Sequence, residues 1–392
     1  MIASLVSCIL HLRREEHQGE ILRYMLIFVP LAVLAEFVYP DPLLVFALSC
    51  IALIPLAGLL GEATEELAIH TGPKVGGLLN ATLGNAAELI ITIVALREGK
   101  FDLVKASITG SILGNLLLIL GLSLLLGGIR HGIQRFDRNL AGVAATMMML
   151  SVVGLMIPTL FELLREVQTG AVDVFNTNVR DPALDALSLW VAGVLIVLYV
   201  LSLIFSFQKP ERGIGAPTGV TDPTAAIEHH TAKWSVPVSL GILAAATIAI
   251  VFLSEFLVGA VEPVVEQLGV SELFLGVILI PIVGNVAEHI VGVQVALKNK
   301  MDLSLSISLG SSMQIALFVA PLLVFVSLLF GREMTLYFSL FEVAALTLAV
   351  LCATQVSLDG ESNWLEGAQL LAVYFIIGLG FFYVVTPGAH GG

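Results

Sequence analysis

The chain has 392 residues, of which 57% are hydrophobic and 12% are charged. Soluble domains average about 45–50% apolar residues with glycine included and about 25% charged residues, so the composition excludes an ordinary soluble domain and indicates a polytopic membrane protein. The formal net charge of −13 comes from 31 acidic and 18 basic residues, which excludes the basic surface that nucleic-acid binding requires. The expected partner is the lipid bilayer, with no nucleic acid.

A membrane-spanning helix needs about 20 mostly apolar residues, and the hydropathy of the chain predicts eleven such helices. In chain order they are 21–38, 42–60, 76–97, 103–127, 140–158, 186–207, 236–258, 270–297, 303–330, 335–353 and 365–385. The predicted fold class is therefore an all-α polytopic membrane protein with eleven transmembrane helices.

The eleven predicted helices divide into a leading helix and two sets of five. Residues 1–39 hold an N-terminal tail and the leading helix, and residues 40–207 hold the first set. Residues 208–235 are rich in proline and glycine and are predicted to form a flexible linker between the halves. Residues 236–392 hold the second set and a C-terminal tail.

The two halves contain matching sequence 200 residues apart. When 76–115 is aligned with 276–315 without a gap, 12 of 40 positions are identical, and shared hydrophobicity does not explain matched Asn, Glu, Asp and Ser. The matching positions in the first half are Gly76, Leu79, Gly84, Asn85, Ala87, Glu88, Ile90, Lys100, Asp102, Leu103, Gly110 and Ser111. Five helices are an odd number, so two such sets in series enter the membrane from opposite sides. This predicts inverted repeats related by a pseudo-two-fold axis in the membrane plane, as in many secondary transporters.

The distribution of basic residues predicts the orientation. With a cytoplasmic N-terminus, two thirds of the 18 basic residues lie in cytoplasmic segments, and Lys105 is among those assigned to the other side. The positive-inside rule therefore favours a cytoplasmic N-terminus and a C-terminus on the opposite side.

The duplicated motif places one carboxylate in each half, Glu88 and Glu288, near the expected midplane. A charge there costs roughly 2.5–3.5 kcal/mol on an insertion scale, and two such carboxylates brought together repel each other strongly. Either a divalent cation or protons must neutralise the pair. These are two exclusive ways to fill one site, which predicts exchange of a cation for protons. The structural alternative is two separate glutamates bonded to neighbouring helices.

The neighbours of these glutamates suit a cation. Asn85 and Asn285 precede them by three residues, on the same helical face, and amide oxygens are ligands that Ca²⁺ accepts. Gly84 and Gly284 loosen the helix, so that carbonyls are freed. Interhelical hydrogen bonding by the asparagines and close packing at the glycines are the alternatives.

Further polar residues follow in the next predicted helix of each half. Ser111 and Ser311 reach the depth of the glutamates, and they complete the predicted metal ligands, unless they only bond their own helices. Asn115 and Gln314 lie one turn further on as secondary candidates.

Other ionisable residues carry weaker predictions. His289, beside Glu288, is either a proton relay or a packing histidine. The acidic cluster Glu62, Glu65 and Glu66 is either a cation-concentrating entrance or a solvated loop face. We expect packing or near-interface roles for Glu36, Glu255 and Glu342, which lack partners in the repeat.

The motifs resemble a known family. Residues 76–90, GGLLNATLGNAAELI, resemble the first signature of the Ca²⁺/H⁺ exchangers (the CAX branch of the calcium/cation antiporters), as does GEATEELA at 61–68. GNVAEH at 284–289, KMDL at 300–303 and GSSMQIALFV at 310–319 resemble the second signature. The resemblance implies an eleven-helix fold with two inverted repeats and Ca²⁺ exchanged for H⁺ through Glu88 and Glu288, without a cofactor. It also implies a possible homo-oligomer in a prokaryotic inner membrane or a eukaryotic vacuolar or organellar membrane.

Three other functions are weighed against this one. A Na⁺/Ca²⁺ exchanger has the same fold, but the sodium-coupled relatives place Ser or Thr where this chain has Asn85 and Asn285, which favours protons. An intramembrane hydrolase with two carboxylates needs neither a repeat nor matched asparagines. A channel usually forms its pore on an oligomer axis, whereas this chain contains a complete pair. The predicted protein is a transporter and not an enzyme.

Overall fold

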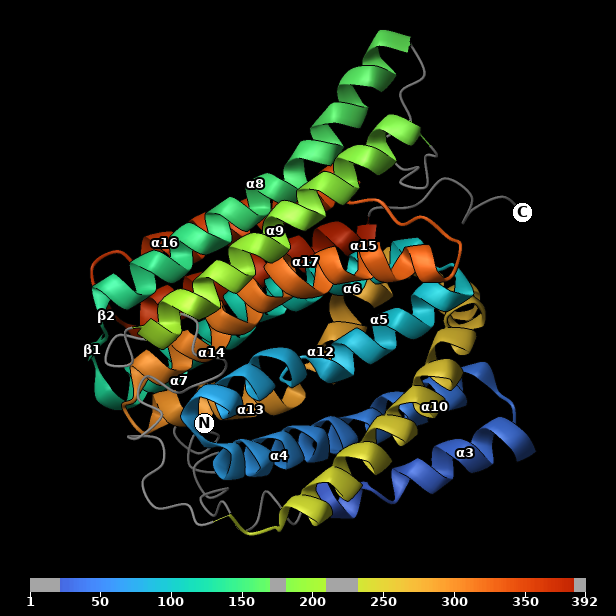
Figure 1. The fold of residues 1–392 in the computed structure, drawn as a ribbon, viewed down its shortest axis with the longest axis horizontal. Coiled ribbons are helices and arrows are strands. Elements are labelled where there is room, and N and C mark those ends of the chain that lie inside the picture. The colour runs from blue at the N-terminus through green and yellow to red at the C-terminus, as the bar shows by residue number, and fades with distance from the viewer. Residues whose placement is uncertain (1–21, 170–180, 209–231, 384–392) are drawn as a thin grey trace.

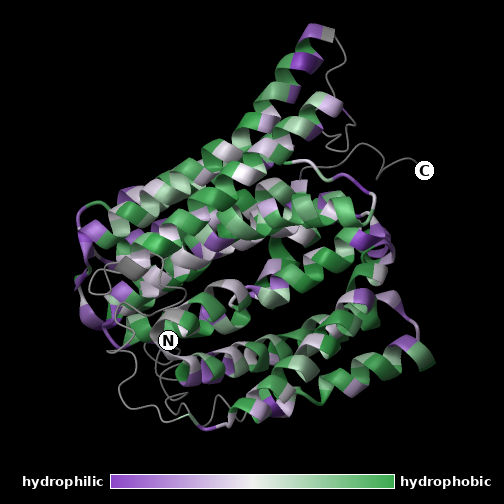
Figure 2. Cartoon of the chain, viewed as in Figure 1, coloured by the Kyte–Doolittle hydropathy of each residue, from purple (hydrophilic) through white to green (hydrophobic). Residues whose placement is uncertain are grey.

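The structure is a computed structural model that describes residues 22–169, 181–208 and 232–383. Apart from one pair of two-residue strands, its elements are helices packed side by side (Figure 1). Hydrophobic residues cover most of the helical surface, and hydrophilic residues concentrate at the connecting loops (Figure 2). This pattern suits a bundle whose sides face lipid, where only helices satisfy the backbone groups of each spanning segment locally.

The first half is a run of long apolar helices. Its elements are α3 (Phe28–Val38), α4 (Pro42–Leu83), α5 (Ala86–Glu98), α6 (Phe101–Leu113), the π-helix η1 (Gly114–Ile119), α7 (Leu120–His131), α8 (Arg138–Thr169) and α9 (Pro182–Gln208). The start of α4 follows from its sequence, because Pro42 suits the first turn and the Asp41 side chain accepts a hydrogen bond from the Leu44 N–H.

The second half begins at α10 (Val236–Leu268). Its further elements are α11 (Glu272–Phe274), the π-helix η3 (Leu275–Leu279), α12 (Ile280–Gly284), α13 (Val286–Leu297), α14 (Met301–Gln314), the π-helix η4 (Ile315–Val319), α15 (Ala320–Leu329), α16 (Leu340–Val356) and α17 (Trp364–Tyr383). Strand β1 (Gln134–Arg135) pairs antiparallel with β2 (Glu361–Ser362). The loop that carries β1 also meets the α13–α14 turn, through Asp137 N–H to Asp302 Oδ1 at 2.6 Å, and we call this end of the bundle the β end.

Elements 200 residues apart have matching local structure. A break at Asn85 separates α4 from α5, and a break at Asn285 separates α12 from α13. The α6–η1–α7 rod is matched by the α14–η4–α15 rod, and both change from α to π geometry just after their Gly-Ser pair. The local conformation therefore repeats with the sequence.

The helices differ in extent from the sequence prediction. The helix expected at 42–60 extends to Gly72, where φ 79° and ψ 172° kink α4. The part of α4 after Gly72 belongs to the next predicted span. The predicted spans 76–97 and 270–297 are each broken in the middle, at Asn85 and at Asn285, directly after the glycines that are expected to loosen the helix. The helix expected from residue 335 begins at Leu340. The linker expected at 208–235 lies almost wholly outside the described residues.

Seven helices of the described chain are long and apolar enough to cross a bilayer, or eight if the bent pair Glu272–Gly284 and Val286–Leu297 is one span. The remaining predicted spans are helical but fail this length criterion. They are α3 with 11 residues, α16 with 17 residues, and the end of α4 with α5, which the break divides. The count of eleven therefore stays a prediction.

The two α–π–α rods form the centre of the bundle. In their most apolar windows, 72% of Phe101–His131 and 67% of Met301–Leu329 is buried, compared with 22% of Val236–Leu268 in α10. Helices α3, α4 and α10 pack against one another as a layer on one side of this core (Figure 1). We call these three helices the outer layer.

The halves differ where a glycine permits close helix approach. A Cβ at Gly110 would lie 2.5 Å from Pro281 Cγ and would overlap the Val277 carbonyl oxygen, so α6 and the η3–α12 segment approach closely at this point. The equivalent Gly310 has no such neighbour within 4 Å and lines a pocket between α8 and α14. Only the first of the two glycines is required by packing.

We expect Gly110→Ala to destabilise the protein and Gly310→Ala to leave its stability almost unchanged. Overpacking of this kind costs about 1–3 kcal/mol, because the Val277 carbonyl belongs to the backbone and cannot rotate away. Thermal unfolding of the two purified variants in detergent measures the difference. Equal melting temperatures would contradict the packing described here.

Candidate cation site

The two motif glutamates occupy equivalent positions in two broken helices. Glu88 lies in the first turn of α5, and Glu288 lies in the first turn of α13. The preceding asparagines leave helical geometry, with φ −102° and ψ 28° at Asn85 and φ −97° and ψ 7° at Asn285. The bend at the second break is 63°. Each carboxylate is therefore attached to the N-terminal end of a helix, where the partial positive charge stabilises an anion.

The fold brings the two motifs together. A Cβ at Gly284 would lie 3.0 Å from Glu88 Oε1 and 3.3 Å from Glu88 Cγ, so the side chain of the first motif packs against the backbone of the second. The Glu88 carboxyl is also near enough to act electrostatically on Glu288. Glu88 is buried, and so are both carboxylate oxygens of Glu288. The sequence prediction that the two halves place their acids in one region agrees with this geometry.

One side of this region is a closed hydrogen-bond network. Asn85 Nδ2 donates to Gln314 Oε1 at 2.6 Å, and Asn85 Oδ1 accepts from the Ser311 hydroxyl at 2.9 Å. Asn115 Nδ2 donates to the same Ser311 oxygen at 2.9 Å. The Ser311 hydroxyl is adjacent to Glu288 as well, but its proton is directed to Asn85. Both polar groups of Asn85 are thus engaged across the two halves.

The other side is only half satisfied. Asn285 Nδ2 donates to the Ser111 hydroxyl at 3.2 Å and to the Pro281 carbonyl at 2.9 Å. Its Oδ1 is buried and has no hydrogen-bond partner among the described residues. Pro281 is one turn before Asn285, and its carbonyl also accepts the Asn285 backbone N–H. The orientation of this amide leaves its oxygen as the unpaired atom.

Four buried oxygens of the site have no hydrogen-bond partner in the described part of the chain. They are both carboxylate oxygens of Glu288, Asn285 Oδ1 and Asn115 Oδ1. Buried polar atoms are nearly always hydrogen-bonded, so several unpaired acceptors in one region point to a cation or proton as partner. Carboxylate and amide oxygens are hard ligands of the kind that Ca²⁺ takes.

The site contains few charged ligands. No group of three or more His, Cys, Asp or Glu side chains that could hold a metal ion occurs within the described ranges. Glu88 and Glu288 are the two motif carboxylates of this region, and the Asn85, Asn115, Asn285, Ser111 and Ser311 side chains form the hydrogen bonds between the two halves. Two ionised carboxylates match the charge of one divalent cation or of two protons.

Two secondary candidates have a different setting from the one expected. Glu62, Glu65 and Glu66 lie within α4, so the solvated-loop reading is wrong. Glu66 is buried and accepts the Trp234 N–H at 3.1 Å, which ties α4 to the start of α10. His289 follows Glu288 in α13, and its Nε2 is buried without a partner among the residues described. Gly84 ends α4 in helical conformation, directly before the break.

Sequence reasoning missed a buried cation near one end of α6. Lys105 was assigned to a segment outside the membrane, but it is 2% exposed and lies 5.9 Å from the centre of the Tyr337 ring. Glu342 is an electrostatic neighbour of Lys105; it forms the capping box of α16 with Ser339 and accepts from Thr109 at 3.1 Å. The available signal was a lysine inside an otherwise apolar stretch.

Comparison with known proteins identifies relatives along most of the chain. The sequence profile described as "Sodium/calcium exchanger protein" matches residues 42–208 and 238–383. The Ca²⁺/H⁺ antiporter of Aphanothece halophytica is 44% identical over 369 residues, which cover 92% of this chain and 95% of that protein. The vacuolar calcium ion transporter of Schizosaccharomyces pombe is 38% identical over 92% of this chain and 84% of its own length.

A solved structure shows the same fold. Native YfkE superposes with a TM-score of 0.77 at 39% identity, over 93% of this chain and 100% of that one, and YfkE is described as a Ca²⁺/H⁺ antiporter. The family resemblance of the two motifs is confirmed by these comparisons. The chain belongs to the sodium/calcium exchanger protein family.

Proposed function

We propose that this protein is a secondary antiporter that exchanges Ca²⁺ for H⁺ across a membrane. The observation that carries the proposal is the contact of Glu88, from one half, with Gly284 of the duplicated motif in the other half. Relatives that cover nine tenths of the chain are Ca²⁺/H⁺ antiporters, which supports the same activity here. The protein is a transporter in this proposal, and Ca²⁺ and H⁺ are its substrates.

The exchange follows from the charge of the site. With both carboxylates ionised, the pair repels itself in a low-dielectric setting, and one Ca²⁺ or two protons neutralise it. Ca²⁺ takes six to eight oxygens, and Glu88, Glu288 and the unpaired oxygens of Asn285 and Asn115 are offered first. Asn85 orients Ser311 and Gln314, while Ser111 orients Asn285. Ca²⁺ and protons bind to the same carboxylates. The protein therefore changes the side to which the site is open only when the site holds either Ca²⁺ or protons.

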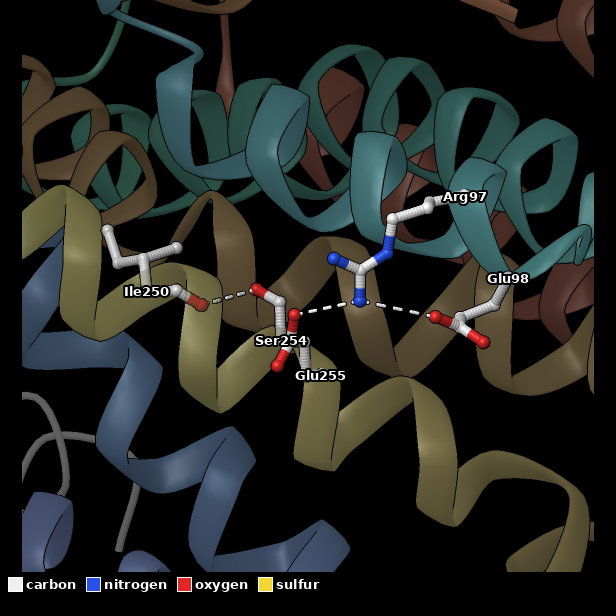
Figure 3. A network of polar contacts seen from close by, with 5 residues as sticks. All are labelled: Arg97, Glu98, Ile250, Ser254 and Glu255. Atoms are coloured by element: carbon white, nitrogen blue, oxygen red, sulfur yellow. Dashed lines mark hydrogen bonds and ion pairs between the residues drawn. The ribbon is translucent and has the colours of Figure 1, made fainter. Parts of the chain in front are cut away.

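The moving part in this proposal is the outer layer of α3, α4 and α10. Its helices pack on each other, and polar contacts connect α10 to the core at the end opposite the β end. There Arg97 of α5 forms ion pairs with Glu98 at 3.2 Å and with Glu255 of α10 at 2.8 Å (Figure 3). Lys100 and Glu262 lie 3.5 Å apart nearby. Exposed ion pairs contribute about 0–1 kcal/mol each, so they are weak enough to break when the layer slides.

The wider architecture completes the proposal. We infer eleven spans arranged as a leading helix and two inverted repeats, with the N-terminus cytoplasmic and the C-terminus opposite. The matching breaks at Asn85 and Asn285 and the matching π-helices support the duplication. A vacuolar calcium ion transporter and a Ca²⁺/H⁺ antiporter of Aphanothece halophytica are among its relatives, which supports a location in a cell membrane or an organellar membrane, according to its source. A homo-oligomer is compatible with this arrangement.

The family name favours one alternative, exchange of Ca²⁺ for Na⁺ on the same fold. Proteoliposomes separate the two functions when Na⁺ and pH gradients are imposed one at a time. We expect ⁴⁵Ca²⁺ uptake with the pH gradient alone. Uptake that needs a sodium gradient and ignores pH would make the protein a Na⁺/Ca²⁺ exchanger.

Replacement of either motif glutamate is expected to abolish transport. In Glu88→Gln and in Glu288→Gln, one negative charge is lost and the remaining carboxylate cannot balance a divalent cation, so pH-driven ⁴⁵Ca²⁺ uptake should fall to background. Glu36→Gln, on α3, is the control and should retain uptake. Robust uptake by either motif variant at normal expression would remove the basis of the assignment.

A methyl group at Gly284 should disturb the site without a change in charge. In Gly284→Ala the new Cβ lies 3.0 Å from Glu88 Oε1, so the carboxylate must shift. We expect the Ca²⁺ KM to rise about tenfold, the equivalent of about 1.4 kcal/mol. Gly193→Ala, in α9, places a Cβ with no neighbour within 4 Å and serves as the control. An unchanged KM in Gly284→Ala would show that Glu88 is not held against this glycine during transport.

A further inference from the structure

Three serine hydroxyls between the cation site and the β end have no hydrogen-bond partner among the described residues. They belong to Ser123 in α7 and to Ser304 and Ser308 in α14, and all three residues are fully buried. Several other buried serines bond to a carbonyl of their own helix, as Ser254 does to Ile250 (Figure 3) and Ser151 does to Met148. That bond is available to any helical serine. The three hydroxyls between the cation site and the β end do not make it, and neither does the buried Ser49 of α4.

The two serines of α14 share a face with a residue of the site. Ser308 and Ser304 precede Ser311 by three and seven residues, which places all three on one side of the helix. Ser311 accepts from Asn115 of η1, so this side of α14 faces the η1–α7 rod. The row leads from the site toward the turn at Asp302, which lies at the β end.

The face of α13 between Glu288 and the β end lies beside these serines. We call this face and the polar residues beside it the column. Gly292 and Ala296 follow Glu288 at steps of four residues, and so lie on the same face over about 12 Å. A Cβ at Gly292 would lie 3.9 Å from the Ser123 hydroxyl oxygen. Gln134 Nε2 donates to the Ala296 carbonyl at 2.9 Å, and its Oε1 is buried and unpaired within the described chain. A Cβ at Gly292 would also lie 2.9 Å from Ile119 Cγ2 of η1 and 3.8 Å from Ile307 Cγ2 of α14. The polar neighbours of this face are therefore Ser123 of α7 and Gln134 of β1.

The other half has no equivalent column. The residues 200 positions from Ser304, Ser308 and Ser123 are Val104, Ile108 and Leu323, all buried. In place of Gly292, Ala296 and Gln134 it has Thr92, Leu96 and Met334, and the Thr92 hydroxyl is bonded to the Glu88 carbonyl of its own helix. The positions held by Ser123, Ser304, Ser308 and Gln134 in one half are thus apolar in the other.

We propose that Ser123, Ser304, Ser308 and Gln134 line a hydrated route that carries protons between Glu288 and the β end, separate from the route of Ca²⁺. This inference rests on the proposed exchange function. Hydroxyls and waters both donate and accept, so a proton passes along them as one O–H bond forms and the next breaks. Ca²⁺ needs six to eight oxygens with charged ligands among them, and none of the four lining residues carries a charge. The column therefore admits protons and excludes the cation.

The first test separates proton movement from cation movement. Wild type and the double variant Ser304→Val with Ser308→Val are reconstituted, and two fluxes are measured: pH-driven ⁴⁵Ca²⁺ uptake, and Ca²⁺/Ca²⁺ exchange at equal pH, which needs no net proton transfer. We expect the variant to lose about tenfold or more of pH-driven uptake, as when a proton-transfer group is removed, and to keep Ca²⁺/Ca²⁺ exchange. The intact exchange also shows that the variant is folded. Ser151→Ala, whose hydroxyl bonds to its own helix, is the matched control and should keep both fluxes.

Two results of this test would contradict the proposal that the column conducts protons. One is unchanged pH-driven uptake in the double variant, and the other is a parallel fall of both fluxes, which would assign the serines to cation binding or to folding. Absence of pH-driven uptake in the wild type would instead refute the proposed function itself. The two failures are therefore distinguishable.

A second test measures hydration directly. In a background without the three native cysteines, Ser304→Cys and Ser308→Cys are compared with Val104→Cys and Ile108→Cys at the equivalent positions of the other half. Ag⁺, a small hydrated thiol reagent, should inactivate the first pair faster than the second when it is added at the β end. Equal rates for the two pairs would mean that the column is as dry as its counterpart, and would overturn the proposal.

Discussion

The structure depends on a single electrostatic constraint: two carboxylates, one from each half of the chain, are buried inside the bundle. The helix breaks before Glu88 and Glu288 serve this constraint in two ways. Each break directs the N-terminal end of a helix at its carboxylate, which favours the negative charge. The break at Gly284 and Asn285 also exposes backbone without a side chain, against which Glu88 packs. A regular helix would offer neither feature, because its N–H groups are already bonded and its surface is covered by side chains.

Residues that match in sequence between the two halves make different contacts near the carboxylates. Asn85 is bonded through both its amide nitrogen and its oxygen, whereas the oxygen of Asn285 is unpaired. Gly110 is in tight contact with the backbone of η3, whereas Gly310 borders a pocket. Residues that match in sequence therefore differ in their contacts between the two halves.

A second difference between the two halves concerns the side chains that lie between the site and each end of the bundle. The rods at the centre of the bundle have similar burial, but polar side chains replace apolar ones on one side only. Buried hydroxyls without partners cost free energy, and the proposed proton route would give these serines a partner in water. The outer layer of α3, α4 and α10 has a different character, because it is joined to the core by exposed ion pairs and few buried polar contacts. The core and the outer layer are thus distinguished by the kind of interaction that holds each.

The sequence by itself determined the membrane class, the apolar segments, the duplication and the glutamates that anchor the candidate site, because these follow from residue type and spacing along the chain. It also indicated the family, because the motifs around Glu88 and Glu288 are recognised from the order of residues alone. Only the tertiary structure decided that Lys105 and Glu66 are buried, that Glu88 packs against Gly284, and which asparagine oxygen is left unpaired. Those features depend on contacts between residues far apart in the chain, such as Asn85 with Gln314 and Glu88 with Gly284, and hydropathy does not encode which partner a polar group meets.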